Sequence, residues 1–137
     1  MGNAEVIADR SGTLSGSPFT RKTVLVVDDD TGFRELVASI LSEAGYQVDQ
    51  AADGSEAIVV AGKSEINLLI TDIVMPIREG IETIRYFSKA LPKVPIVAVS
   101  GTSRYLQWAK ALGAAATLEK TSVAADLLHT VRRVIGE

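Results

Sequence analysis

Residues 23–30 read Thr-Val-Leu-Val-Val-Asp-Asp-Asp, an apolar and mostly β-branched run that ends abruptly in carboxylates. Such a run is typical of a strand in a parallel sheet, where helices cover both faces. Asp28 and Asp29 stand directly behind this predicted strand. Because open α/β sheets bind their ligands outside the carboxyl ends of the strands, these two carboxylates are candidates for a binding site.

The same pattern recurs further along the chain. Asp72, Ser100 and Lys120 each stand at the end of a short strand-like run. The three runs cover residues 68–71, 95–99 and 116–119. If these runs are parallel neighbours in one sheet, all of these side chains emerge at the same edge. The sequence therefore predicts one acidic pocket with a cation beside it.

Composition limits the classes of protein to which this chain can belong. With 137 residues and 47% hydrophobic residues, it has the size and apolar content of one domain with one ordinary core. A net charge of -3 leaves no basic stripe for a phosphate backbone, so we expect no direct contact with nucleic acid. The absence of cysteine excludes disulfides, thiolate metal sites and thiol catalysis. No apolar run reaches the roughly 18 residues of a membrane span, and we expect a cytoplasmic protein.

The chain divides into a leader and one domain. Residues 1–20 lack sustained periodicity and are predicted to be a flexible N-terminal leader, which leaves residues 21–137 as the folded domain. From Thr23 onward, strand-like runs alternate with amphipathic stretches, and five βα units fit. This alternation predicts an α/β fold, a doubly wound parallel sheet in three layers.

The first predicted helix has the clearest pattern. It begins at an N-cap at Asp30 or Thr31 and stops at Gly45. Its predicted inner face consists of apolar residues at helical spacing: Phe33, Leu36, Val37, Ile40, Leu41 and Ala44. Polar and apolar residues alternate over 46–51 and predict an edge strand, whereas the apolar residues 68–70 predict a central one.

Four more helices follow from the same periodicity. They are predicted at residues 54–63, at a stretch marked by Ile81 to Leu91 and stopped by Pro92, at 104–112, and at 124–135. The predicted helix at 104–112 carries Trp108, which becomes part of a candidate partner surface if its ring is exposed.

Carboxylates gathered at one sheet edge repel one another, and a hard divalent cation is the simplest compensation. Because no His or Cys accompanies them, Mg²⁺ or Mn²⁺ is favoured over zinc. A carboxylate beside such an ion can also attack phosphorus and form an aspartyl phosphate. Lys120 could then offer its charge, and Ser100 a hydrogen bond, to the phosphoryl oxygens.

At these residues the chain resembles the receiver domains of two-component response regulators, in particular single-domain chemotaxis receivers. The resemblance extends over about residues 23–135. It rests on four motifs in order: Val26-Val27-Asp28-Asp29-Asp30, Thr71-Asp72-Ile73-Val74-Met75-Pro76, Val99-Ser100-Gly101 and Glu119-Lys120. It implies a flavodoxin-like sheet with strand order 2-1-3-4-5.

The resemblance also implies a metal site and a phosphoacceptor. Asp72 would accept a phosphoryl group from a histidine kinase or a histidine phosphotransfer protein. Mg²⁺ would be bound at Asp72, by Asp29 directly, by Asp28 mainly through water, and by the backbone carbonyl of Val74. The protein would be a phosphoprotein in a phosphorelay rather than an enzyme, with at most self-phosphorylation and autodephosphorylation activity.

Two further residues and the output take their roles from the same resemblance. Ser100 would be the hydroxyl that moves toward the phosphoryl group, and Lys120 would form an ion pair with that group. The signal would pass through protein–protein contacts with a downstream target, and a phosphorylation-dependent dimer is a further expectation.

The chain departs from the family pattern after Ser100. Thr121 follows Lys120 where receivers usually have a proline, often after a cis peptide bond. Since a cis bond before a non-proline residue costs about 2.5–4 kcal/mol, we predict a trans Lys120–Thr121 peptide and a rearranged loop that could misplace the lysine.

Thr117 stands where the family often has Tyr or Phe, so switching would depend on Ser100 and loop movement, or on a weaker response of Thr117. The stretch from Ser100 to Lys120 is also about two residues short, which predicts a short or displaced fourth helix.

More than one interpretation stays open for some residues and for the function. Asp30 is more simply a helix cap than a metal ligand, and His129 a surface residue without a catalytic role. A Mg²⁺-dependent phosphohydrolase using Asp72 lacks a second carboxylate two residues later, where Val74 stands. The chain could also be a pseudo-receiver that only makes protein contacts, or a receiver cut from a larger regulator with an output domain.

Overall fold

The computed structural model describes residues 21–73 and 77–137. The predicted leader at residues 1–20 and the predicted ligand Val74 lie outside the described residues, so both stay predictions.

The described residues form one parallel sheet of five strands in the order β2-β1-β3-β4-β5. The strands are β1 (Thr23–Val27), β2 (Gln47–Ala51), β3 (Leu68–Asp72), β4 (Ile96–Ser100) and β5 (Ala116–Glu119). Every residue of β3 is buried, whereas β2 lies at one border and keeps several polar residues at least partly exposed. The predicted strand order, the edge strand and the central strand are all confirmed.

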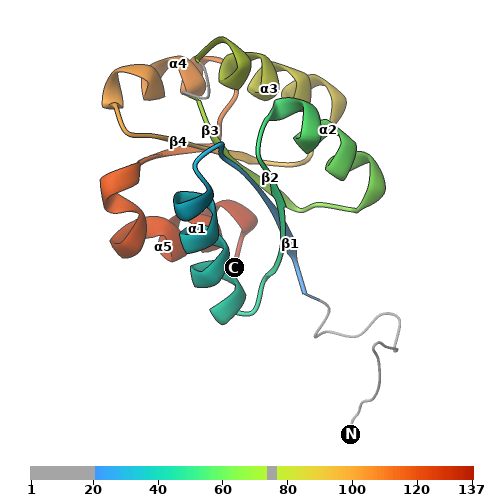
Figure 1. The fold of residues 1–137 in the computed structure, drawn as a ribbon, viewed down its shortest axis with the longest axis vertical. Coiled ribbons are helices and arrows are strands. Elements are labelled where there is room, and N and C mark those ends of the chain that lie inside the picture. The colour runs from blue at the N-terminus through green and yellow to red at the C-terminus, as the bar shows by residue number, and fades with distance from the viewer. Residues whose placement is uncertain (1–20, 74–76) are drawn as a thin grey trace, which may run out of the picture.

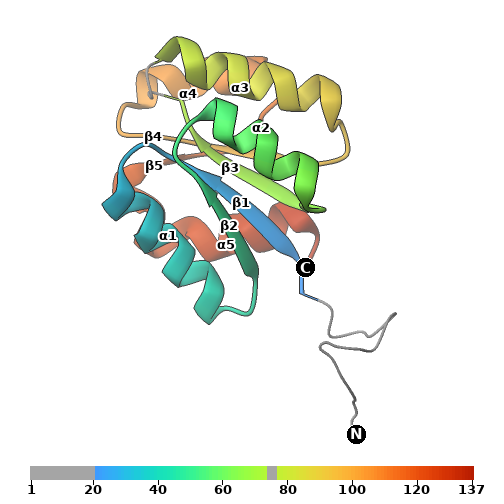
Figure 2. The same ribbon diagram turned by 45° about the vertical axis from the view of Figure 1, so that its right-hand side comes forward.

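Helices cover both faces of this sheet, as Figures 1 and 2 show. α1 and α5 lie on one face, and α2, α3 and α4 on the other. The helices are α1 (Thr31–Glu43), α2 (Gly54–Lys63), α3 (Ile77–Ala90), α4 (Leu106–Ala111) and α5 (Val123–Ile135), with short 3-10 turns η1 (Ser103–Tyr105) and η2 (Lys120–Ser122). The predicted three-layer doubly wound fold is thus confirmed.

Two apolar cores lie between these layers because successive strand residues point to opposite faces. In β1, Leu25 and Val27 pack into the core that also contains Ile84 and Phe87 of α3. Val24 and Val26 pack into the other core, which contains Val37 and Leu41 of α1 together with Leu127 and Val131 of α5. The apolar runs recognised in the sequence therefore fill both sides of the sheet, which leaves the polar strand ends free to form a site.

The first helix begins and ends as its sequence predicts. Asp30 is the N-cap, and its Oδ1 accepts a hydrogen bond from the Phe33 backbone N–H at 3.2 Å. Gly45 follows the helix with a φ of 101°, a left-handed conformation that glycine adopts at no steric cost. The expectation that Leu36 faces the core is wrong, because its side chain is 48% exposed. Leu36 lies at the edge of the apolar face of α1, and only the middle of that face is buried against the sheet.

The fourth helix is short, as predicted. Residues 104–112, expected as one helix, divide into the turn η1 and the six-residue α4, and Gly113 follows with a φ of 116°. Trp108 is 49% exposed and lies against the Tyr105 ring, with 5.2 Å between the ring centroids. α3 begins at Ile77, earlier than its apolar pattern indicated. Among the helices of the described residues, none combines the length and the apolar character that crossing a bilayer requires.

Candidate functional site

The predicted site residues meet at the carboxyl edge of the sheet. Asp28 directly follows β1, and Asp72 is the last residue of the adjacent strand β3. Ser100 is the last residue of β4, and Lys120 is the first residue after β5. The register pairs Val27 with Thr71, so Asp28 and Asp72 come next to each other where the two strands end.

Three carboxylates form the centre of this edge. Oxygen atoms of Asp28, Asp29 and Asp72 all lie within 4.8 Å of one another. Asp28 and Asp72 are only 1% and 4% exposed, whereas Asp29 is exposed. The cluster is therefore buried on the sheet side and open toward solvent, so that an ion or a phosphoryl donor could approach it from outside.

Lys120 reaches into this cluster from the far edge of the sheet. Its Nζ lies 3.0 Å from Asp28 Oδ2 and 3.0 Å from Asp72 Oδ2. The Lys120–Thr121 peptide is trans, as predicted, because the described residues contain no cis peptide bond. The expected misplacement of the lysine is wrong. The backbone turns into η2 directly at Lys120, but the long, flexible stem still carries the ammonium to the two carboxylates.

The electrostatics of the cluster follow from burial and from this ion pair. Burial raises the pKa of Asp28 above its ordinary value, the negative charge of Asp72 adds to that rise, and hydrogen bonds from the Asp30 N–H and from Lys120 oppose it. Burial lowers the pKa of Lys120, but its hydrogen bonds to Asp28 and Asp72 and their charges outweigh burial and raise that pKa. Lys120 is therefore a charged ammonium that bridges two carboxylates.

Asp28 offers a specific place for a cation. Its Oδ1 accepts the Asp30 N–H at 2.8 Å. Its Oδ2 is buried and forms an ion pair with the Lys120 ammonium at 3.0 Å. Among the described residues, three carboxylates share this single ammonium, and buried carboxylates are costly unless cations compensate their charge. Because the donor set consists of carboxylates, the chemistry of these residues fits Mg²⁺ or Mn²⁺.

The residues around the fourth and fifth strands are placed as follows. Ser100 is fully buried, and its Oγ accepts the Thr102 backbone N–H at 3.0 Å. This bond ties the hydroxyl to the loop that follows β4. A β-carbon added at Gly101 would meet no atom within 4 Å, so space is open beside the serine. Thr117 is half-buried on β5.

Two residues of α1 belong to the site although sequence reasoning gave them no such role. The Phe33 ring lies under the ammonium, 4.5 Å from Lys120 Nζ to the ring centroid. Arg34 donates from Nη1 to the Asp28 carbonyl oxygen at 2.6 Å and from Nε to Gln50 Oε1 at 3.0 Å. A cation in the first turn of a helix is unfavourable beside the positive end of the helix dipole. This unfavourable position is the feature of the sequence that could have indicated a specific partner for Arg34. Phe33 gave no signal beyond its apolar spacing.

α3 packs tightly against the strand end that carries Asp72. A β-carbon added at Gly80 would lie 2.5 Å from both Cα and O of Ile73, the residue after Asp72. Glycine at position 80 is therefore what allows the helix to approach this backbone.

Comparison with known proteins gives concordant matches. The family model described as the response regulator receiver domain matches residues 24–132. The Regulator of RpoS of Escherichia coli is 33% identical over 95 residues, which cover 69% of this chain and 28% of that relative. The chain thus spans under a third of the length of this curated relative.

Two solved structures of response regulators are similar to this chain in both sequence and fold. Chemotaxis response regulator CheY4 of Vibrio cholerae is 34% identical with a TM-score of 0.76, over 84% of this chain and 99% of that one. Response regulator protein TrrA of Thermotoga maritima, solved in complex with Mg(2+)-BeF, is 31% identical with a TM-score of 0.73, over 82% and 98%. Together with the strand order and the family match, these likenesses establish that the chain belongs to the response regulator receiver domains of two-component systems.

Proposed function

We propose that this chain accepts a phosphoryl group on Asp72 from a phosphohistidine of a histidine kinase or phosphotransfer protein. The observation that supports the proposal most is the arrangement around Asp72. This buried carboxylate lies within 4.8 Å of the oxygens of Asp28 and Asp29 and 3.0 Å from a lysine ammonium. A nucleophile, a set of hard-metal ligands and a cation thus meet at one open edge of the sheet.

In the proposed transfer, a carboxylate oxygen of Asp72 forms a bond to phosphorus while the phosphorus–nitrogen bond of the donor histidine breaks. The imidazole leaves with the electron pair of that bond. Bound Mg²⁺, held by Asp28, Asp29 and Asp72 with the Val74 carbonyl as the predicted fourth ligand, would neutralise charge on the phosphoryl oxygens.

Lys120 and Ser100 would bind the transferred group. Lys120 already carries its charge to Asp72, so in this proposal it exchanges a carboxylate oxygen for a phosphoryl oxygen as its partner. Ser100 would have to weaken its bond with the Thr102 N–H, and the loop after β4 would move with it. The phosphoryl group would then favour one of two loop arrangements and change the surface offered to a partner.

Labelling by a small phosphodonor tests the assignment. The protein is incubated with acetyl phosphate and Mg²⁺, and the intact mass is followed. We expect the mass of one phosphoryl group to be added to the wild type and to Asp126→Ala, an exposed α5 control, but not to Asp72→Ala. Equal labelling of Asp72→Ala would refute the role of Asp72.

The proposal also covers the enzymatic activity of the protein, its place in the cell and its relation to a larger regulator. Catalysis would be limited to self-phosphorylation and autodephosphorylation, in the cytoplasm. Thr117 and Thr121 favour a pseudo-receiver, but Lys120 reaches both carboxylates despite Thr121. The full-length gene product tests the alternative of a receiver cut from a larger regulator with an output domain.

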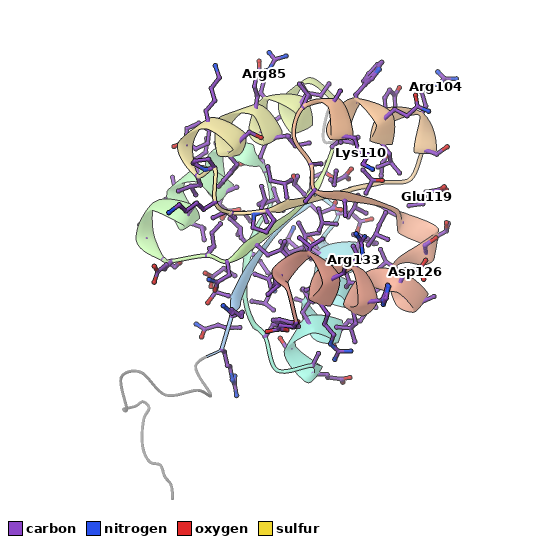
Figure 3. The ribbon with its side chains drawn as sticks, turned by 180° about the vertical axis from the view of Figure 1, so that it is seen from behind. Arg85, Arg104, Lys110, Glu119, Asp126 and Arg133 are labelled. Carbon is purple, nitrogen blue, oxygen red and sulfur yellow. The ribbon has the colours of Figure 1, made fainter. Side chains whose placement is uncertain are left out.

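The surface around α4 is the proposed contact with protein partners, including a second copy of this chain. Trp108 is exposed there and lies against the partly buried Tyr105 ring. Figure 3 shows charges of both signs on this side, with Arg104 and Lys110 around α4, and Glu119 and Asp126 on the β5 and α5 side. Opposite charges on one surface allow two copies to pair face to face. Size-exclusion chromatography of phosphorylated protein should show a larger species that Trp108→Ala abolishes, and an unchanged elution volume on phosphorylation would speak against the dimer.

A further inference from the structure

Lys120 receives little positional help from the backbone. β5 ends at Glu119, which pairs with Ser100 as the last residues of the β4–β5 ladder. Lys120 then begins η2, and no side chain caps that turn. The lysine follows this edge strand. Its side chain must cross the end of β4 to reach Asp72, at the end of β3, and Asp28, the residue after β1. A lysine stem with four rotatable bonds has many alternative conformations, so its position has to be selected by contacts at the ammonium.

Among the described residues, three groups contact the ammonium. Two are carboxylate oxygens, of Asp28 and Asp72, each at 3.0 Å. The third is the Phe33 ring, whose centroid lies 4.5 Å away, within the range in which an aromatic face attracts a cation. The Lys120 side chain is 23% exposed, so this attraction is only partly screened by solvent.

The ring itself is fixed independently of the lysine. Phe33 stands in the first turn of α1, and its backbone N–H is bound by the cap residue Asp30. Its half-buried side chain packs against the core that contains Val37 and Leu41. Phe33 is therefore a rigid support, whereas both carboxylates would also be ligands of the metal and would have to share their oxygens with it.

We propose that Phe33 is a positioning residue that holds the Lys120 ammonium at the phosphoacceptor carboxylate through the face of its ring. The inference rests on the proposed phosphoacceptor function and deepens it. In this proposal, a residue of α1 supports the side chain of a lysine that follows β5, at the far edge of the sheet. If Asp28 and Asp72 held Mg²⁺, they would share their charge between the metal and Lys120, and the ring would be the contact of the ammonium that the metal does not use.

A first experiment measures the position of the lysine without phosphorylation. In the metal-free protein, the ring current of Phe33 should move the Lys120 ε-methylene proton resonances upfield, and Lys120→Met identifies these resonances. The shift should persist in Phe33→Trp, which keeps an aromatic face, and disappear in Phe33→Leu, which keeps an apolar side chain. An unshifted wild-type resonance would overturn the proposal.

A second experiment measures the consequence for phosphorylation. With acetyl phosphate and Mg²⁺, Phe33→Leu should label about two- to fivefold more slowly than wild type, as the loss of a partly exposed cation–π contact implies. Phe33→Trp should restore the rate. In a Lys120→Met background, which keeps the stem without the charge, Phe33→Leu should have no further effect. Leu36→Ala, one turn further along α1 and exposed, is the matched control and should label at the wild-type rate.

The outcomes separate the two proposals. If the wild type labels on Asp72 and Phe33→Leu labels equally fast, or slows equally in both lysine backgrounds, the positioning role is refuted and the phosphoacceptor function stands. If the wild type does not label at all, the phosphoacceptor function fails, and the positioning role that rests on it fails too.

Discussion

Arg34 shows how much of this site depends on residues that contact neither an ion nor a phosphoryl group. Its guanidinium binds the carbonyl of Asp28, at the peptide that joins the two acidic residues after β1. Its second contact, with Gln50 of the edge strand β2, fixes the guanidinium from the other side. The direction in which the Asp28–Asp29 backbone leaves the sheet is therefore set from α1 and β2 together.

Replacing Arg34 by Met should test this bridge. The variant keeps an apolar stem but loses a charge-assisted hydrogen bond to a partly buried carbonyl, so we expect the free energy of unfolding to fall by about 1–2 kcal/mol. Urea unfolding gives the value, with the exposed Arg133→Met on α5 as a control expected to change by under about 0.5 kcal/mol. If Mg²⁺ binds as proposed, its dissociation constant should also rise in Arg34→Met. An equal effect of both substitutions on stability would contradict the bridging role.

Side chains that act within one strand or helix could be predicted, and those that act between elements could not. Asp28, Asp72 and Lys120 followed from one rule, because each directly follows or ends a strand of a parallel sheet. The misplacement predicted for Lys120 was wrong, since the reach of a long side chain across several strands is a tertiary property. Phe33 and Arg34 were missed for the same reason, because their partners lie in η2, after β5, and in β2.

At the scale of elements, helix packing places the strand end that carries the phosphoacceptor candidate. Gly80 brings α3 against the Ile73 backbone so closely that a β-carbon would lie 2.5 Å from it. A second close approach joins α2 to α3, where a β-carbon at Gly54 would overlap the Thr83 hydroxyl. The apolar pattern of α3 began at Ile81 and gave no sign of its first turn, which is the part that approaches β3.

Two glycine substitutions in helices should therefore have opposite effects. Gly80→Ala has to displace α3 from rigid backbone, and we expect a loss of about 1–3 kcal/mol in the free energy of unfolding despite the better helix propensity of alanine. Gly62→Ala in α2 meets no atom within 4 Å and should gain up to about 1 kcal/mol. Thermal and urea unfolding of the pair decide the matter. A stabilised Gly80→Ala variant would show that the contact between α3 and Ile73 is loose.

At the scale of the whole molecule, α1 is fixed at both of its ends. Its first turn carries the cap Asp30 and the site residues Phe33 and Arg34. After its last turn, the buried Tyr46 donates a hydrogen bond from its hydroxyl to Glu137 Oε1 at 2.6 Å. The last residue of this chain thus joins α5 to the turn between α1 and β2, at the opposite end of the sheet from the carboxylates.

The bond between Tyr46 and Glu137 should make stability depend on pH in the alkaline range. Burial, the hydrogen bond to Glu137 and the charge of that carboxylate, against a smaller opposing effect of Arg132, raise the pKa of Tyr46 to about 12. Because the folded pKa lies above the unfolded value of about 10, the stabilisation is complete below pH 10 and is lost as pH rises toward 12.

Tyr46→Phe lacks this titration. Near pH 7 it should be about 1 kcal/mol less stable than wild type. Urea unfolding at pH 7 to 11.5 should show the wild-type advantage shrinking above pH 10 and then reversing, with a total change of about 2 kcal/mol at pH 11.5. Tyr86→Phe, a change at an exposed tyrosine of α3, is the control and should follow the wild type throughout. A difference between wild type and Tyr46→Phe that stays constant across this range would mean that Tyr46 titrates alike in the folded and unfolded chain, and that the contact with Glu137 does not persist in solution.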